Sequence, residues 1–203
     1  MRLLPCGDVG LLVELADLDE VLALYADLED LHLEGVVDKV PAARTLLLTI
    51  DPAVTTPAAV AETVRGRSPR AGARPRLGSV EVPVSYDGPD LAEVAELTGM
   101  SEREVIAAHT GREWTVAFCG FAPGFGYMVS EDEGLGVPRR TDPRTSVPPG
   151  SVALAGGFTS VYPRESPGGW QLIGRTEVVP WDLTRDPPAL FSPGVRVRFV
   201  EAS

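Results

Sequence analysis

The sequence predicts an α+β protein, in which a small α/β N-terminal domain precedes a β-rich barrel or sandwich. Helix and strand patterns alternate over residues 1–65, and a Gly-, Pro- and Arg-rich stretch at 66–78 is typical of a linker. Beyond residue 112 the strand patterns are all short and are separated by Pro and Gly. A length of 203 residues suits one large or two small domains. We therefore expect domains at 1–65 and 79–203.

The first domain has the predicted order strand, helix, strand, strand, helix. Its strands are expected at 11–15, 36–40 and 45–50, and its helices at 18–28 and 57–64. Gly35 is expected to end the first helix, and Pro57 suits the first turn of the second. This order predicts helices on one face of an antiparallel sheet.

The second domain begins with a strand and two short helices. Residues 80–85 alternate apolar and polar residues around Pro83, which predicts an edge strand because proline cannot donate to a ladder. A helix over 90–97 is followed by Gly99. Ser101 and Glu104 have the spacing of a capping box for a second helix, which ends near His109. A strand is expected at 114–119.

Composition and motifs exclude several classes of protein. The formal charge of −11 makes nucleic acid a poor partner, and no apolar run reaches the ~18–20 residues of a membrane span. Two distant cysteines and two histidines have no metal-binding spacing, and with no secretory leader pattern we expect a cytoplasmic protein without a metal. The sequence has neither a P-loop nor a GxSxG elbow, and so no self-sufficient catalytic set.

Glycine-rich loops and arginines concentrate in the second half of the chain. Residues 137–203 contain eight arginines and six acidic residues, although the whole protein is strongly acidic. Loops within 120–127, 138–152 and 161–176 combine glycines with aromatic and basic side chains. Backbone amides beside guanidinium groups suit a carboxylate or a phosphate. We expect these loops to converge on one concave anion site that another polypeptide completes.

The same loops carry a family resemblance. Six segments occur in order within residues 80–199: VPVSYDGPDLAEVA, EVIAAHTG, GFAPGFGYM, VPRRTDPRTSVPPGSVALAGG, YPRESPGGWQLIGRT and PGVRVRF. In these segments the chain resembles the family of the 5-oxoprolinase B subunit, also described as allophanate hydrolase subunit 1, which includes the Kip inhibitor of a sporulation histidine kinase. Two positions depart from the family pattern: Gly126 replaces a proline, and Phe158 replaces a frequent glutamine.

The resemblance implies a small α/β domain followed by a cyclophilin-like β-barrel. It also implies one part of an ATP-dependent 5-oxoprolinase, which converts 5-oxoproline, ATP and water to glutamate, ADP and phosphate. The expected partners are the enzyme's A and C subunits, of which the C subunit is homologous and cyclophilin-like. ATP is then a co-substrate of the complex, and no cofactor is bound tightly.

Other functions stay open at this point. The resemblance also allows a subunit of an allophanate or urea-amide hydrolase, or a histidine-kinase inhibitor that binds the kinase dimerisation domain. The barrel type alone would allow a prolyl isomerase, although a fold does not by itself carry a function.

The matching motifs supply the candidate site residues. The candidate catalytic residues are His109, Arg139 and Arg144. The candidate substrate-binding residues lie in the glycine-rich and aromatic loops: Pro123, Gly124, Phe125, Tyr127, Ser151, Tyr162, Gly168, Gly169, Trp170 and Arg175. Arginines and loop amides suit the negative charge that develops when an amide is opened.

A structural role competes with several of these functional roles. His109 can pack as a satisfied histidine at its helix end, and Phe121 is expected to plug the end of the barrel. Arg140 is expected to be a solvated loop charge. Trp170 can be a packing anchor, and Arg175 can pair with a structural carboxylate.

Overall fold

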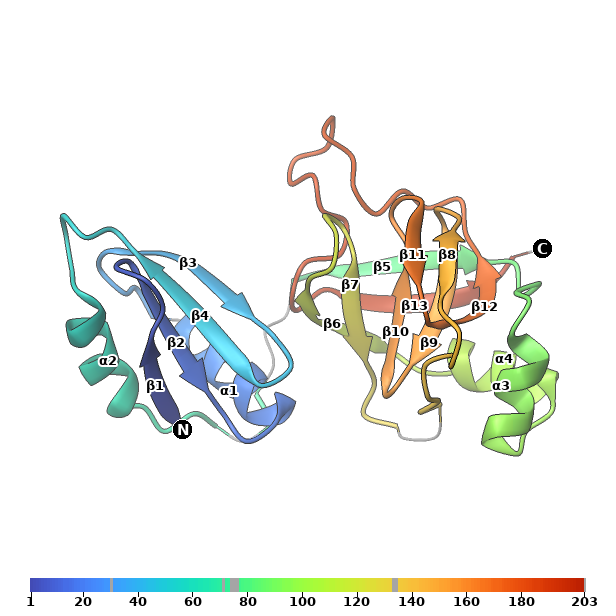
Figure 1. Cartoon of the computed structure of the whole chain (residues 1–203), viewed down its shortest axis with the longest axis horizontal. Helices are drawn as coiled ribbons and strands as arrows, with labels where there is room; N and C mark the ends of the chain where they lie inside the picture. The colour runs from blue at the N-terminus through green and yellow to red at the C-terminus, as the bar shows by residue number, and fades with distance from the viewer. Residues whose placement is uncertain (30, 71, 74–76, 133–134, 203) are drawn as a thin grey trace. The chain divides into compact units, whose positions relative to one another are not determined.

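The computed structural model describes residues 1–202 except 30, 71, 74–76 and 133–134 (Figure 1). The chain separates into two compact units, Met1–Arg76 and Leu77–Ser203. Their boundary falls within the predicted linker at 66–78, of which residues 71 and 74–76 lie outside the described part. Each unit has a hydrophobic core of its own. None of the helices in the described part is long and apolar enough to cross a membrane.

The N-terminal unit is a four-stranded antiparallel sheet packed against two helices. The strands are β1 (Arg2–Pro5), β2 (Gly10–Glu14), β3 (Val36–Pro41) and β4 (Thr45–Ile50), in the order β1-β2-β4-β3. The helices are α1 (Leu18–Glu29) and α2 (Pro57–Arg65). Alternate residues of β4 point to the helices, so that Leu46, Leu48 and Ile50 are buried. The unit therefore has the predicted layers.

Two details of this unit differ from the sequence-based expectation. Strand β1 was not predicted, because its four residues include a proline and are too few to show a period; it pairs with β2 from Arg2↔Glu14 to Pro5↔Leu11. Gly35 does not end α1, which stops at Glu29. Gly35 has φ +76 before β3 and lies against Thr55, where a Cβ would not fit.

The C-terminal unit is a nearly closed barrel of seven strands, in the order β12-β9-β10-β7-β6-β13-β5. The strands are β5 (Ser79–Val84), β6 (Trp114–Cys119), β7 (Gly126–Val129), β9 (Ser151–Ala155), β10 (Phe158–Val161), β12 (Gln171–Arg175) and β13 (Arg196–Glu201). An isolated bridge between Ser85 and Arg175 joins the two ends of this sheet. Strands β8 (Arg144–Val147) and β11 (Ser166–Gly168) form a separate pair. The fold class predicted from the sequence is confirmed.

Two short helices, α3 (Leu91–Thr98) and α4 (Glu102–Thr110), pack beside the barrel. Helix α3 is followed by Gly99 in the left-handed conformation, at φ +69. Helix α4 begins with the predicted capping box, in which Ser101 and Glu104 satisfy each other's backbone amides. Strand β5 is an edge of the sheet and contains Pro83, as expected.

Strand β9 is buried on both faces, and this places the candidate site. Val152 and Leu154 pack into the barrel core. Ala153 and Ala155 point to the other face, where they contact a second cluster that contains Phe125, among other aromatic side chains. Because successive side chains of a strand alternate, one strand serves as the wall between the two clusters.

Candidate functional site

Seven aromatic side chains cover the face of β9 that points away from the barrel core. We call them the aromatic cluster: Phe118, Phe121, Phe125, Tyr127, Phe158, Tyr162 and Trp170. Phe125 is 1% exposed and lies at its centre. Its ring makes edge contacts with Tyr127, Tyr162 and Trp170 at centroid distances of 5.1, 5.2 and 5.3 Å. Residues 118–127 and 158–170, which are distant in sequence, therefore meet here, as two of the three loop motifs predicted.

A tight double turn carries the first of these segments into β7. The Ala122 amide donates to the Gly120 carbonyl at 2.7 Å, and the Phe125 amide donates to the Ala122 carbonyl at 3.0 Å. Pro123 is exposed at this turn, and Gly124 has φ +83. A Cβ on Gly124 would lie 2.9 Å from the Cβ of Trp181, so glycine is required both for the turn and for this contact.

Phe121 corrects one expectation. It does not plug the barrel: its side chain is 56% exposed, and its ring edge contacts Phe125 at 5.2 Å. Phe121 is also the one described non-glycine residue with positive φ, at +65. A large residue held in this conformation stores backbone strain, and such residues gather at functional sites.

Tyr162 is fixed against the Gly168–Gly169 loop. Its hydroxyl accepts a hydrogen bond from the Trp170 amide. A Cβ on Gly168 would lie 2.3 Å from that hydroxyl oxygen, so only glycine leaves room for it. The Gly169 carbonyl accepts the Arg140 amide at 2.7 Å, which ties the arginine-containing segment to the same loop.

Arg139 is the exposed cation of the site. Among the residues that the structure describes, no carboxylate pairs with it. Burial raises the pKa of Tyr127, and the nearby Arg139 charge opposes this rise. Burial also raises the pKa of Tyr162, while the Trp170 amide and the charges of Arg139 and Arg144 lower it. Both hydroxyls are therefore protonated donors beside a cation at neutral pH.

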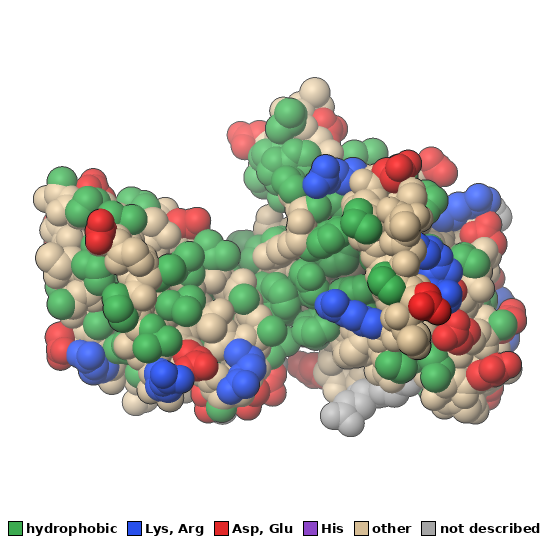
Figure 2. Space-filling view, in the orientation of Figure 1, with side chains coloured by type: hydrophobic (Ala, Val, Ile, Leu, Met, Phe, Trp, Pro, Cys, Tyr) green, Lys and Arg blue, Asp and Glu red, His purple; other side chains and the backbone are tan. Residues whose placement is uncertain are grey.

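Arg144 and Arg140 are held by a buried carboxylate. Asp90, which is 2% exposed, accepts from Arg144 at 2.6 Å and from Arg140 at 2.8 Å. Arg140 also contacts Glu93 at 3.2 Å. Arg140 is thus an ion-pair partner and not the solvated charge expected from the sequence. In Figure 2, basic side chains lie beside hydrophobic ones on the face of this unit that carries β8 and β11.

Sequence reasoning did not identify three residues that contribute to this site: Asp90, Glu93 and Gln171. Asp90 has the position of a helix N-cap, and residues 50 and 54 positions away supply its partners. The clearest signal in the sequence is an excess of arginine at 139–144 without enough local acid to balance it. Gln171 donates to Glu93 at 3.2 Å and extends the network, because Glu93 also contacts Arg140.

His109 lies apart from the aromatic cluster, in the barrel core. It is fully buried and packs against Phe199, with ring centroids 4.3 Å apart. The Thr159 hydroxyl donates to the Ala153 carbonyl at 3.2 Å, so it accepts from His109 Nε2 at 2.9 Å. His109 Nδ1 then accepts from the Tyr86 hydroxyl at 2.7 Å. Burial, together with the charge of Arg112, lowers the pKa of His109 to about 3. This geometry favours the structural role.

Two further candidates are occupied in structural contacts. The Ser151 hydroxyl donates to the Pro148 carbonyl at 2.8 Å, which fixes the turn into β9. Arg175 stands at the seam between β12 and β5 and pairs with Asp87 at 3.0 Å. The structure therefore does not bring Arg175 into the aromatic cluster.

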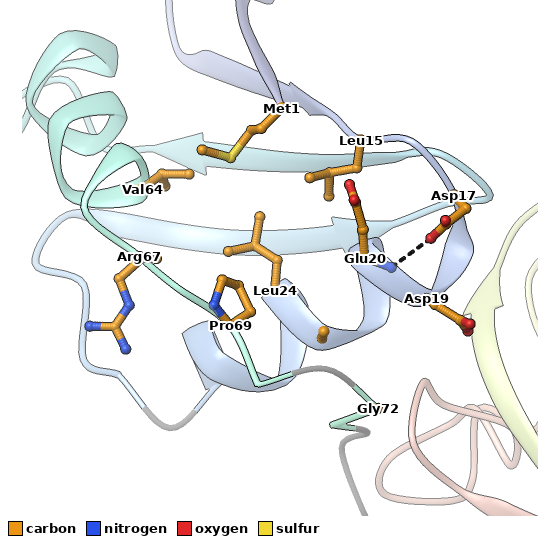
Figure 3. Close-up of a pocket in the computed structure, with 11 residues that line it drawn as sticks. Met1, Leu15, Asp17, Asp19, Glu20, Leu24, Val64, Arg67, Pro69 and Gly72 are labelled. Carbon is orange, nitrogen blue, oxygen red and sulfur yellow. Dashed lines mark hydrogen bonds between the residues drawn. The ribbon is translucent and has the colours of Figure 1, made fainter.

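A pocket of about 530 Å³ in the N-terminal unit is separate from this site (Figure 3). Leu15, Leu24 and Val64 line it with apolar surface, and Asp17 and Glu20 stand at its rim. Asp17 accepts the Glu20 amide at 2.9 Å, and the Glu20 carboxylate accepts the Ala16 amide at 3.0 Å. These carboxylates cap the start of α1, and we assign the pocket no ligand.

Fold and site together define a two-unit α+β protein, with a barrel that presents an arginine-flanked aromatic surface suited to a small anion. The chain belongs to the family of the carboxyltransferase domain, subdomains C and D, whose model matches residues 1–191.

Named relatives refine this family. The chain is 50% identical to the B subunit of 5-oxoprolinase from Escherichia coli O157:H7 over 129 residues, which make up 62% of this chain and 59% of the relative. The match therefore spans less than two thirds of that protein. The crystal structure of TTHA0988 is 36% identical, with a TM-score of 0.77, and the match covers 96% of this chain and 40% of that one.

One more distant structure shares the fold. The match to the Kluyveromyces lactis urea amidolyase has a TM-score of 0.72 and 18% identity, and it covers 99% of this chain and 15% of that one. The same architecture therefore occurs as one segment of a much longer chain.

Proposed function

We propose that this chain is one subunit of an ATP-dependent 5-oxoprolinase complex, in which it acts with an A subunit and with a homologous, cyclophilin-like C subunit. The relative named as the B subunit of 5-oxoprolinase supports this assignment. The composition of the site supports it too. The described residues around the aromatic cluster provide cations, hydroxyls and ring faces, but no nucleophile paired with a base. Such a surface binds and orients a substrate, and the remaining chemistry falls to the partners.

The observation that carries the proposal is Arg139, an exposed cation without a carboxylate partner in the described chain, beside Tyr127 and Tyr162. 5-Oxoproline has one carboxylate and one lactam ring. A guanidinium binds a carboxylate through charge-assisted hydrogen bonds, and aromatic faces suit the ring. Arg139 then orients the substrate, while the hydroxyl of the partly exposed Tyr127 donates to one of its oxygen atoms; Tyr162, which is 1% exposed, supports the cluster from within.

The chemistry requires activation of a stable amide. Phosphoryl transfer from ATP to the lactam oxygen releases ADP and makes the ring carbon a better electrophile. Water adds to that carbon, and breaking the C–N bond gives glutamyl phosphate with a free amine. A second water then releases glutamate and phosphate. Arg139 and Arg144 suit the negative charge that develops on oxygen during these steps, because fixed donors need no reorganisation.

The test is reconstitution of the complex. This chain is purified with its A and C partner subunits, and ADP and glutamate are measured with and without 5-oxoproline. The proposal predicts ATP hydrolysis that depends on 5-oxoproline and yields one glutamate for each ADP. An assembled complex that hydrolyses no ATP with 5-oxoproline, or that prefers an unrelated amide, contradicts it.

A further inference from the structure

The buried carboxylate of Asp90 joins three parts of the barrel unit. It accepts Arg140 Nη1 at 2.8 Å and Arg144 Nη2 at 2.6 Å on one oxygen, and the Leu172 amide at 2.6 Å on the other. The Asp90 amide donates in return to the Leu172 carbonyl at 3.0 Å. The Asp90 side chain is 3% exposed, so these bonds form out of water and fix their partners firmly.

The segment around Arg139 is anchored on both sides of that residue. The Val137 amide donates to the Gly156 carbonyl at 3.1 Å, and the Arg140 amide donates to the Gly169 carbonyl at 2.7 Å. Gly156 lies two residues before Phe158 and Gly169 lies directly before Trp170, so the backbone on either side of Arg139 is tied to two segments that carry members of the aromatic cluster. The Asp90–Arg140 ion pair adds a side-chain anchor to the residue next to Arg139.

Arg144 is fixed in the same way. Its backbone pairs with Gly168 across β8 and β11, beside the hydroxyl of Tyr162. One of its terminal nitrogens, Nη2, is held by Asp90, whereas Nη1 is buried and has no hydrogen-bond partner. Among the described residues, Asp90 is the hydrogen-bond partner that holds this partly buried guanidinium, whose side chain is 23% exposed.

We propose that Asp90 is a positioning residue, which holds Arg140 and Arg144 so that Arg139 and Arg144 face the aromatic cluster. Asp90 does not itself meet the substrate. The identity of the ligand that Arg139 and Arg144 bind rests on the proposed function. The positioning of these arginines by Asp90 does not depend on it. The Asp90 side chain makes no capping hydrogen bond to α3, so the main consequence of a neutral side chain at this position is the release of both guanidinium groups.

The direct test is the ionisation of Tyr127 and Tyr162 in Asp90→Asn. The four tyrosines are labelled with ¹³C at Cζ and titrated by NMR, and Tyr127→Phe and Tyr162→Phe assign the signals. If Asp90 positions the arginines, their phenolate-stabilising charge moves away and both tyrosine pKa values rise. If Asp90 is only a nearby negative charge, removing it lowers both values instead. The two roles therefore predict opposite signs.

Two variants serve as positive and negative controls for the tyrosine titration. Arg139→Gln gives the rise expected when that cation is removed altogether. Glu113→Gln removes the same charge as Asp90→Asn from an exposed pair with Arg196, and no change in either tyrosine pKa is expected.

A second variant keeps the test decisive if Asp90→Asn does not fold. Asp90→Glu keeps the charge and moves the carboxylate by one methylene. A rise in either tyrosine pKa in Asp90→Glu supports the proposal, and unchanged values overturn it.

Kinetics of the reconstituted complex supply an independent readout. Misplaced arginines raise the KM for 5-oxoproline about tenfold, and kcat falls as well because the same arginines face the developing negative charge. A purely structural defect lowers the active fraction, so that kcat falls while KM stays constant. A KM that does not change in folded Asp90→Asn overturns the proposal. If the wild-type complex shows no turnover with 5-oxoproline, the proposed function fails, and the tyrosine titration still decides the role of Asp90.

Discussion

The barrel unit contains two clusters in which aromatic rings surround polar groups, and they differ in how completely the polar groups are paired. Around the fully buried His109 and Thr159, both ring nitrogens, the Tyr86 hydroxyl and the Thr159 hydroxyl all have partners. Around Phe125, the exposed guanidinium of Arg139 has no carboxylate partner in the described chain. The two clusters lie on opposite faces of β9.

This difference in pairing assigns the His109 cluster a structural role and makes the aromatic cluster the candidate binding site. A complete polar network specifies a core, and nothing in it is left over for a ligand. The exposed guanidinium of Arg139, next to the aromatic cluster, keeps hydrogen-bond donors that can bind a ligand. Histidine is the residue type most often chosen as a catalyst, yet here the arginine next to a glycine-rich loop is the better candidate.

The largest expected effect concerns His109 and acid stability. Its pKa of about 3 lies below the ~6.5 of an unfolded histidine, so the unfolded chain binds the extra proton between these values. The stabilisation from neutral His109 is present above pH ~6.5 and is lost as the pH falls towards 3. Its size is up to about 5 kcal/mol, since each pKa unit corresponds to about 1.4 kcal/mol.

The measurement is urea unfolding of the wild type and of His109→Gln at several pH values. At pH 7 the variant is expected to be less stable, by about 1–3 kcal/mol, because buried partners lose a hydrogen bond. This gap should narrow as the pH is lowered. Parallel stability curves for the two proteins would show that His109 is not held neutral by the core.

The second effect concerns Arg139, on the other side of the comparison. Arg139→Gln is expected to raise the KM for 5-oxoproline about 10- to 100-fold, the equivalent of one charge-assisted hydrogen bond. Unfolding free energy should be nearly unchanged, because the side chain is exposed. Arg103→Gln is the control: it breaks an exposed pair with Glu201 and should leave KM as it is. Equal KM values for wild type and Arg139→Gln would remove Arg139 from the site.

The third effect tests the close approach of Tyr162 to its loop. Gly168→Ala places a Cβ where the Tyr162 hydroxyl stands, at 2.3 Å, and should cost about 1–3 kcal/mol of stability. Gly157→Ala is the matched control, because no atom lies within 4 Å of its added Cβ and its φ is not positive. We expect that control to change stability by less than about 0.5 kcal/mol. Similar unfolding free energies for both variants would contradict the packing described for Tyr162.

The smallest effect concerns the strain at Phe121. Phe121→Ala keeps a side chain at φ +65 and loses the ring contacts, whereas Phe121→Gly also relieves the backbone. The glycine variant should therefore be more stable than the alanine variant, by about 1 kcal/mol, in thermal or urea unfolding. The opposite order would show that the turn imposes no strain.

Sequence reasoning succeeded where the signal is local. The capping box of Ser101 and Glu104 spans one helical turn, and Pro83, which has no N–H donor, is typical of an edge strand. The convergence of the glycine-rich loops at 120–127 and 161–176 was also predicted, and Phe125, Tyr162 and Trp170 from these loops meet in one cluster.

Sequence reasoning failed where a contact joins distant segments. Nothing in the residues next to Asp90 shows that Arg140 and Arg144 become its partners, since that pairing depends on how β8 and α3 meet. The depth of His109 could not be read from helical spacing alone, because its partner Thr159 lies 50 residues away. Strand β1 was missed since four residues are too short for a pattern.

The central claim is that the arginine-flanked aromatic cluster holds the carboxylate of the substrate. The most direct measurement is a crystal structure of the assembled complex with 5-oxoproline bound. We predict a carboxylate oxygen at ~2.8 Å from the Arg139 guanidinium, with the lactam ring against the aromatic side chains. A fully occupied 5-oxoproline bound elsewhere in the complex, with Arg139 facing solvent, would contradict it.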